Sequence, residues 1–334
     1  MEKELRMGLI AALENKPSAN FSAEDVNTAA LNGLLKEIGL TSESDARTIR
    51  AHESEAFALI EEAVDEILPK KLEGVLGEFA EVKQFGRTDE VVFNIEKIGR
   101  GRAKLTISKG ARGGIYRAAR LDNKHFGLAT SVETVAVYVT LEELILGTIS
   151  LGELFQNILE GFEERVYIEV FKALAAGKGV TNAVTAETGK NALSGAIDKV
   201  LPKVKQYGIP TIFGSYQGLA SLSNEAITDH PELEDSADRR NYGLIRLYKG
   251  CKVVELPNYL VTDATEKEDW AYDPKYVFVM PSGAKPVKVA LRGDLVITKN
   301  VQAVGSEKWE ASKMIGVGVA MANNYAVISI NDLN

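Results

Sequence analysis

The feature that most constrains the fold is a long amphipathic pattern over residues 149–175. Apolar residues recur there at steps of three and four, and the other face of the expected helix holds five glutamates. A helix over this range would be roughly 40 Å long at 1.5 Å per residue, well above the mean for globular domains. The apolar positions are Leu151, Leu154, Phe155, Ile158, Leu159, Phe162, Val166, Val170 and Leu174. Such a helix needs a wide apolar partner surface, so we expect it to be the spine of a large core.

Composition excludes several classes of protein. The chain has 334 residues, of which 45% are hydrophobic and 26% charged, which is typical of globular proteins. The single cysteine, Cys251, excludes an internal disulfide framework, and the histidines His52, His125 and His230 are scattered, so we expect no metal or cofactor. The net charge of −8 argues against a surface dedicated to nucleic acid. No run of 18 apolar residues is present, so we expect no membrane span.

Motifs that carry catalytic chemistry are missing from the sequence. The stretch Gly99-Arg100-Gly101 lacks the third glycine of a dinucleotide loop, and no phosphate-binding loop is present. Ser215 lies where a nucleophile elbow would place its serine, but Phe213 stands where that motif needs glycine, so a helix cap is favoured. Cys251 is best interpreted as a small buried residue. The sequence therefore predicts no enzyme and no catalytic residue.

Acidic and basic side chains are concentrated in two different segments of the chain. Residues 1–68 hold 14 acidic and 6 basic side chains, in three expected helices with thin apolar stripes, the third ending at Pro69. Residues 97–124, the basic segment, hold nine basic side chains and one acidic one and are rich in glycine. We expect the N-terminal helices to form an acidic arm that is ordered by packing on other subunits.

The basic segment allows three interpretations. It could be a solvated hairpin, a nucleic-acid contact made through its arginines, or a contact with a protein of opposite charge. Only Tyr116 and Phe126 could stack on bases, which weakens the second interpretation. The third is favoured because the acidic arm of a neighbouring copy supplies such a partner.

The second half of the chain alternates helix and strand. We expect a helix over 193–206 and strands over 209–214, 251–256 and 276–280. Closer to the C-terminus we expect two strand pairs. One joins 286–291 to 294–298 through a turn at Arg292-Gly293, and the other joins 315–321 to 325–330.

This order of parts resembles a known family. An acidic helical arm, a basic hairpin, a spine helix, an α/β insert and closing strands resemble the major capsid proteins of tailed phages, which share the Hong Kong 97 capsid fold with encapsulins. Local stretches resemble it too, namely 67–73, 137–146 leading into 151–176, 208–213, 250–257, and 290–297 with 315–330.

The resemblance implies an α+β fold of four parts. The N-terminal helical arm would cover 1–72 and an extended basic loop 87–128. A peripheral domain would combine 73–86, 129–180 and 285–334 and include the spine helix, and an axial domain would cover 181–284.

The resemblance also implies a structural function. The chain would assemble as hexamers and pentamers into the icosahedral head shell around phage DNA, made in the host cytoplasm and retained in the virion. Its partners would be a scaffolding protein, portal and head-completion proteins, and double-stranded DNA bound without sequence-specific contact. An encapsulin-type compartment is the alternative, and a soluble α/β hydrolase or an RNA-binding protein is a more remote one.

Three sets of site residues follow from the charges and the resemblance. The loop contacts to another subunit are Arg100, Arg102, Lys104, Lys109, Arg112, Arg117 and Arg120. The arm contacts are Glu61, Glu62 and Asp65, and the acidic interior face is Glu153, Glu160, Glu163 and Glu164.

Overall fold

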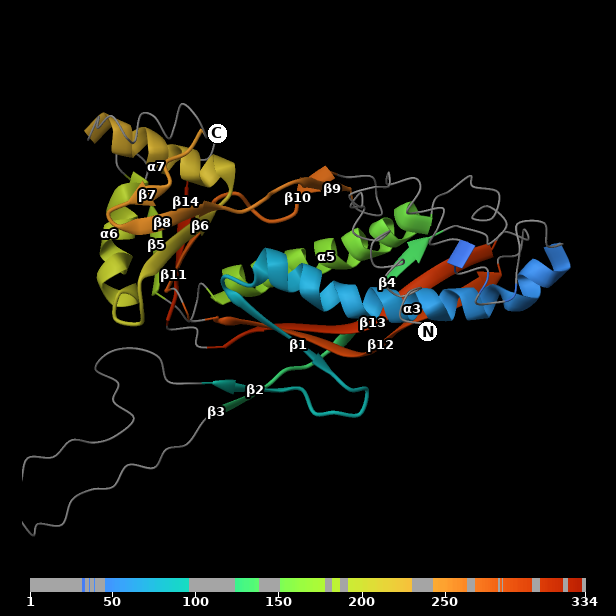
Figure 1. The fold of residues 1–334 in the computed structure, drawn as a ribbon. Coiled ribbons are helices and arrows are strands. Elements are labelled where there is room, and N and C mark those ends of the chain that lie inside the picture. Colours follow the sequence, from blue (N-terminus) through green and yellow to red (C-terminus); the bar gives the residue numbers. More distant parts are fainter. Residues whose placement is uncertain are drawn as a thin grey trace, which may run out of the picture.

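A computed structural model gives the fold (Figure 1). It describes residues 46–95, 124–137, 151–177, 182–186, 192–229, 243–262, 268–281, 285–301, 307–320 and 324–331, and five isolated positions. Helices α3 (Ala46–Leu76) and α5 (Leu151–Ala176) lie side by side over one face of a four-stranded sheet. A six-stranded sheet with helices α6 (Ala192–Val204) and α7 (Tyr216–Asp229) stands at one end.

The four-stranded sheet has the order β1, β12, β13, β4, with bounds Ala80–Phe85, Val287–Val301, Glu307–Val319 and Ser131–Val137. β1 is parallel to β12, and the other pairs are antiparallel. The turn expected at Arg292-Gly293 was wrong, because β12 passes straight through it. The register shifts between Arg292 and Val296, and Gly293 has a φ of 68°. A bulge and a turn both need a glycine with positive φ, so the local sequence does not distinguish them.

The six-stranded sheet has the order β5, β14, β11, β6, β8, β7. Their bounds are Asn182–Ala186, Ala326–Ile330, Tyr276–Pro281, Pro210–Gly214, Cys251–Glu255 and Leu247–Tyr248. The expected pairing of 315–321 with 325–330 was wrong, since β13 and β14 lie in different sheets. Every residue of β14 is buried, so the strand needs apolar neighbours on both faces and finds them at an interior position of this sheet.

Two short hairpins complete the described strands. β9 (Leu260–Thr262) pairs with β10 (Glu268–Trp270), and β2 (Val92–Ile95) pairs with β3 (Lys124–Gly127). The second hairpin lies on the side of the four-stranded sheet opposite α3 and α5 (Figure 1). The strand expected over 104–108 lies outside the described residues.

The spine helix is confirmed, since α5 covers 151–176 and buries its apolar stripe. Phe162, Val166, Val170 and Leu174 are each fully buried. They belong to a core that also takes residues from both sheets, whereas a second core lies between the six-stranded sheet, α6 and α7. The last strand of the expected peripheral domain, β14, therefore lies in the sheet built from the expected axial domain.

α3 runs for 31 residues and contains Pro69, so the expectation that this proline ends the helix was wrong. Leu68, Leu72 and Leu76 continue its buried stripe past the proline. Their burial offsets the roughly 3 kcal/mol that a proline costs inside a helix. The helix thus crosses the arm boundary placed at residue 72, and its buried face belongs to the chain's own core. The two helices expected before residue 45 lie outside the described residues, apart from isolated positions.

Candidate functional site

Ser215 and Cys251, the two candidate nucleophiles that the sequence offers, have structural roles. Ser215 Oγ accepts a hydrogen bond from the Gly218 N–H at 3.1 Å at the start of α7, which confirms the helix cap. Cys251 is fully buried, and burial raises the pKa of its thiol. Within the described ranges no three His, Cys, Asp or Glu side chains gather as a metal site. None of the described helices is both long enough and apolar enough to cross a bilayer.

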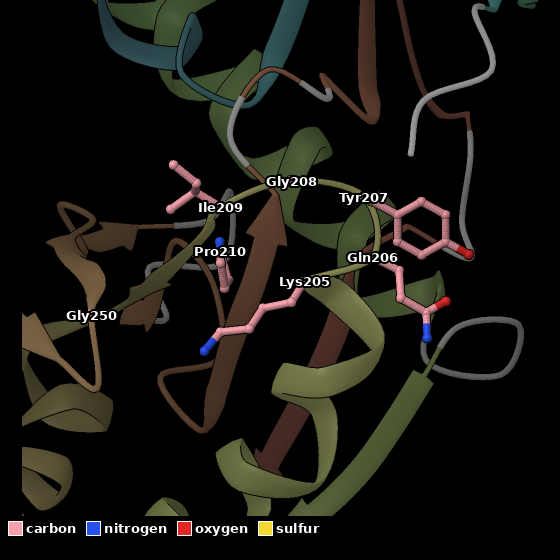
Figure 2. A pocket seen from close by; sticks show the side chains of 7 residues that line it. All are labelled: Lys205, Gln206, Tyr207, Gly208, Ile209, Pro210 and Gly250. Atoms are coloured by element: carbon pink, nitrogen blue, oxygen red, sulfur yellow. The ribbon is translucent and has the colours of Figure 1, made fainter. Parts of the chain in front are cut away.

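The hollow in Figure 2 lies at one end of the six-stranded sheet. It has a volume of about 560 Å³ and is lined by Lys205, Gln206, Tyr207, Gly208, Ile209, Pro210 and Gly250. Ile209 is 69% exposed, and it points away from Tyr207 across the loop. Because the lining side chains do not converge on a common point, the hollow lacks the arrangement that catalysis needs.

The root of the basic loop consists of β2 and of a descending limb, β3 with residues 128–129, and this descending limb is seated on β13. A Cβ at Gly316 would lie 2.6 Å from the Ala129 carbonyl oxygen, and one at Gly318 would lie 2.6 Å from Leu128 Cδ1. Residues 316 and 318 share one face of the strand, so the two glycines open a slot in which the descending limb lies. Arg100, Arg102, Lys104, Lys109, Arg112, Arg117 and Arg120 lie farther along the loop, outside the described residues.

β2, the ascending limb that leads into the basic loop, is anchored by Phe93, which is fully buried. Its ring meets Phe85 edge-on at 5.5 Å, and the Nζ atoms of Lys83 and Lys288 lie 5.4 and 5.9 Å from its centroid. Glu81 forms ion pairs with both lysines. Burial by itself would raise the pKa of Glu81, but the hydrogen bonds and charges of the lysines lower it overall. Sequence analysis missed this anchor, although a lysine inside the apolar strand at 287–291 was a signal for it.

The three arm residues differ in their surroundings. Asp65 Oδ2 accepts a hydrogen bond from the Leu295 N–H at 2.6 Å, and its other oxygen pairs with the fully buried Lys313. Glu61 accepts a hydrogen bond from the Ile297 N–H. Both carboxylates therefore bind the chain's own sheet, whereas Glu62 is exposed. A contact of these residues with another subunit stays a prediction.

The acidic residues of the spine helix also differ in whether they have a cationic partner. Glu163 pairs with Lys71 of α3 at 2.9 Å. Glu160 is exposed and accepts a hydrogen bond from Gln156 at 2.6 Å, and Glu164 has no cationic partner among the described residues. The side chain of Glu153 lies outside the description. The unneutralised acids of this face are thus Glu160 and Glu164.

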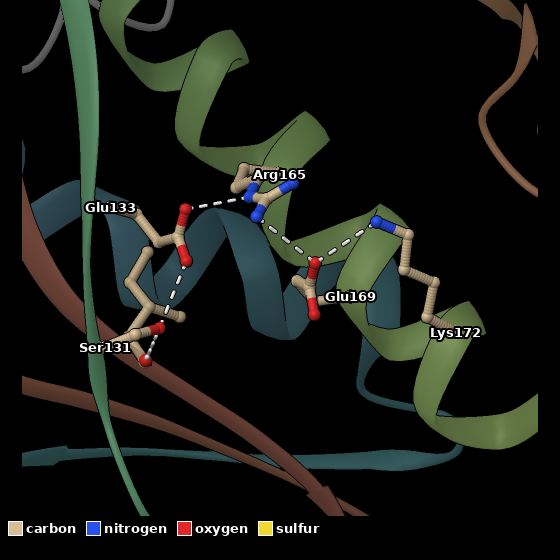
Figure 3. A network of polar contacts seen from close by, with 6 residues as sticks. Ser131, Glu133, Arg165, Glu169 and Lys172 are labelled. Carbon is tan, nitrogen blue, oxygen red and sulfur yellow. Dashed lines mark hydrogen bonds and ion pairs between the residues drawn. The ribbon is translucent and has the colours of Figure 1, made fainter. Parts of the chain in front are cut away.

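Farther along α5 the charges balance one another (Figure 3). Arg165 Nε contacts Glu133 of β4 at 2.8 Å, and an Nη atom of the same guanidinium contacts Glu169 at 3.3 Å. Lys172 Nζ contacts Glu169 at 3.4 Å, and Ser131 Oγ donates to Glu133 at 3.1 Å. Two carboxylates face two cations, so this network ties β4 to the helix without adding net charge.

Comparison with known proteins identifies a family that matches the sequence and solved structures that resemble the fold. Over residues 10–329 the sequence matches the model of the YonB family, SPbeta prophage-derived capsid proteins. A search of curated proteins finds no match. The fold resembles a chain of the satellite phage P4 procapsid that includes the size determination protein. The TM-score is 0.52 at 11% identity, covering 81% of this chain and 92% of that one.

Two further solved structures are similar. The capsid of the cyanophage P-SCSP1u gives a TM-score of 0.49 at 10% identity, covering 77% of this chain and 88% of that one. The virus-like particle from Pyrococcus furiosus gives a TM-score of 0.44 at 13% identity, covering 79% of this chain and 98% of that one. The fold class and the family resemblance are confirmed. Because the family model spans nearly the whole sequence, the chain belongs to the YonB family of SPbeta prophage-derived capsid proteins.

Proposed function

We propose that the chain builds an icosahedral head shell of hexamers and pentamers around phage double-stranded DNA. The observation that carries this proposal is the family match over residues 10–329. Members of a capsid family assemble into shells and belong to the virion, which places this chain in the particle. Assembly takes place in the host cytoplasm with a scaffolding protein, and portal and head-completion proteins finish the head.

The role is structural and not enzymatic. Ser215 and Cys251, the side chains with potential nucleophiles, are used for a helix cap and for core packing. DNA inside the shell meets the protein without sequence-specific contacts. Glu153, Glu160, Glu163 and Glu164 line the interior, where carboxylates repel DNA phosphates and keep the packaged DNA from adhering. Glu160 and Glu164 carry most of this effect, because Glu163 is paired with Lys71.

Particle size and content test this proposal. Expressed protein should sediment as large shells, and electron microscopy of particles from an induced lysogen should show heads that hold nuclease-protected DNA. Shells that instead enclose a protein cargo would point to an encapsulin-type compartment. A small soluble oligomer under all conditions would contradict the shell.

The basic segment of one subunit contacts acidic surface of the next. Glu62 is the arm residue best suited to this contact, because Glu61 and Asp65 already bind their own sheet. Exposed ion pairs contribute only about 0.2–1 kcal/mol each, so several must act together. They are screened as the ionic strength rises beyond roughly 0.15 M, and assembly should slow accordingly.

Charge reversal tests the contact. Arg100→Glu, Arg102→Glu and Arg112→Glu together should block shell formation, and Glu62→Lys should restore part of it. The matched control reverses three exposed lysines on α6 and directly after it, Lys199→Glu, Lys203→Glu and Lys205→Glu, and so changes the net charge by the same amount. Light scattering follows the assembly rate. If the control blocks assembly equally, net charge and not this contact is responsible.

A further inference from the structure

The edge of β12 is left without a strand over part of its length. β1 ends where Phe85 faces Arg292, whereas β12 continues to Val301 and stays paired with β13 on its other side. Residues 293–301, the edge segment, therefore have no strand on the β1 side among the described residues. Such an edge offers its N–H and C=O groups to any other strand that approaches.

α3 supplies acceptors to this edge. Asp65 Oδ2 accepts from the Leu295 N–H at 2.6 Å, and Glu61 accepts from the Ile297 N–H. Four helical residues advance about 6 Å and two strand residues about 6.8 Å, so successive turns of α3 match alternate residues of β12. The helix position four residues before Glu61 is Phe57, which has no acceptor for the N–H of Lys299.

The two carboxylates are costly groups for this position. Lys313 compensates the charge of Asp65. Glu61 has no such cation among the residues that the structure describes, and burial raises its pKa. The Ile297 N–H opposes that shift, and the charges of Asp65 and Asp294 add to it. An apolar side chain would pack against the sheet without a desolvation penalty. The carboxylate of Glu61 is therefore explained by the edge N–H that it occupies.

The edge segment has the composition of a strand that pairs readily. Leu295-Val296-Ile297-Thr298 is apolar and β-branched, and Val296 is 44% exposed. Subunits of a shell meet at high local concentration, so the most available partner is the same segment of a second copy. Two identical edges can pair antiparallel about a two-fold axis.

We propose that Glu61 and Asp65 guard the edge segment of β12 against pairing with the edge segment of a second copy. The two carboxylates occupy the N–H groups that such a pairing would use, and α3 blocks the approach. Association between subunits is then confined to the contacts that build the shell. This role goes beyond the proposed capsid function and can be tested on unassembled subunits.

Removal of the Glu61 carboxylate tests the guard. Glu61→Ala should give a severalfold rise in irregular, non-shell aggregate in analytical ultracentrifugation, and Glu62→Ala on the exposed side of the same helix should not. Ile297→Pro in the Glu61→Ala background should suppress the aggregate. The N–H of Ile297 points away from β13, so the proline removes only the edge donor.

Several results would overturn the proposal. One is Glu61→Ala protein that aggregates no more than Glu62→Ala. Another is aggregate that persists in the double variant. If Glu61→Ala fails to fold, hydrogen exchange of the backbone amides in the wild-type chain tests the proposal instead. The amides of Leu295 and Ile297 should exchange more slowly than that of Lys299, and equal exchange of the three would also reject the guard.

Discussion

The two long helices lie in one core but are attached by different chemistry. α5 contacts the six-stranded sheet and the segments beside it through aromatic rings. Phe171 lies 5.8 Å from Phe278 of β11 and stacks on Tyr272 at 4.3 Å, and the Tyr167 hydroxyl donates to the Pro257 carbonyl at 2.5 Å. α3 reaches the four-stranded sheet with the carboxylates of Glu61 and Asp65 as well as with its apolar stripe. The aromatic contacts depend on shape and apolar area, whereas the carboxylate contacts also depend on ionisation.

This difference has consequences for stability. Burial raises the pKa values of Tyr167 and Tyr272, so both phenols stay neutral at any pH at which the shell is studied. Burial raises the pKa of Glu61 on α3 above its usual value of 4.5, so this carboxyl group takes up its proton in milder acid than a free glutamate. The aromatic contacts of α5 should therefore resist changes of pH, whereas the Glu61 contact of α3 should respond to them.

Deletion of α3 up to residue 66 should have the largest effect. A chain that begins at residue 67 loses Phe57, Ile60 and Val64, which are 3%, 1% and 0% exposed. Burial of each such side chain stabilises by about 1.5–3 kcal/mol, and a whole domain has only about 5–15 kcal/mol. We expect this chain to lose cooperative thermal unfolding in circular dichroism. A chain that begins at residue 46 keeps α3 and should fold. Equal melting of both chains would show that α3 is not part of the core.

Asp65→Ala should have the next largest effect. It leaves the fully buried Lys313 without its carboxylate, which costs about 3 kcal/mol or more. Adding Lys313→Met should recover most of the loss, because an apolar side chain would then replace the unpaired buried charge. Urea denaturation measures both variants. A double variant as unstable as the single one would mean that the unpaired charge is not the cause.

The pH dependence of two glutamates should give the smallest effect, with opposite signs. The pKa of Glu81 in the folded chain lies below the reference value of 4.5. Its ionised form therefore stabilises the fold at a pH above 4.5, and this contribution is lost as the pH falls through the pKa of the folded state. The pKa of Glu61 lies above the reference, so its ionisation costs stability at neutral pH, and that cost disappears in mild acid.

The measurement compares the unfolding midpoint of the wild-type chain, at each pH, with the midpoints of Glu61→Gln and Glu81→Gln. As the pH falls from neutral, the wild-type chain should gain stability relative to Glu61→Gln. Below about pH 4.5 it should lose its advantage over Glu81→Gln. Tyr272→Phe, on the aromatic side of the comparison, should differ from wild type by the same amount at every pH. A slope for Tyr272→Phe as steep as for the glutamates would remove the distinction between the helices.

The sequence by itself determined the elements that depend on near neighbours. The stripe of α5, the cap at Ser215 and most strand positions follow from side chains a few residues apart, which local periodicity and turn chemistry specify. The family resemblance rested on the order of these elements along the chain, and it held.

Tertiary structure decided the contacts between distant residues. Asp65 meets Leu295, 230 positions away, and no local pattern reports that meeting. The passage of α3 through Pro69 and of β12 through Gly293, and the separation of β13 from β14, depend on which apolar surface lies opposite each element. Strand pairing and helix docking are chosen by the free energy of the whole core, so a proline or glycine that ends an element locally is accepted where the surrounding burial outweighs its cost.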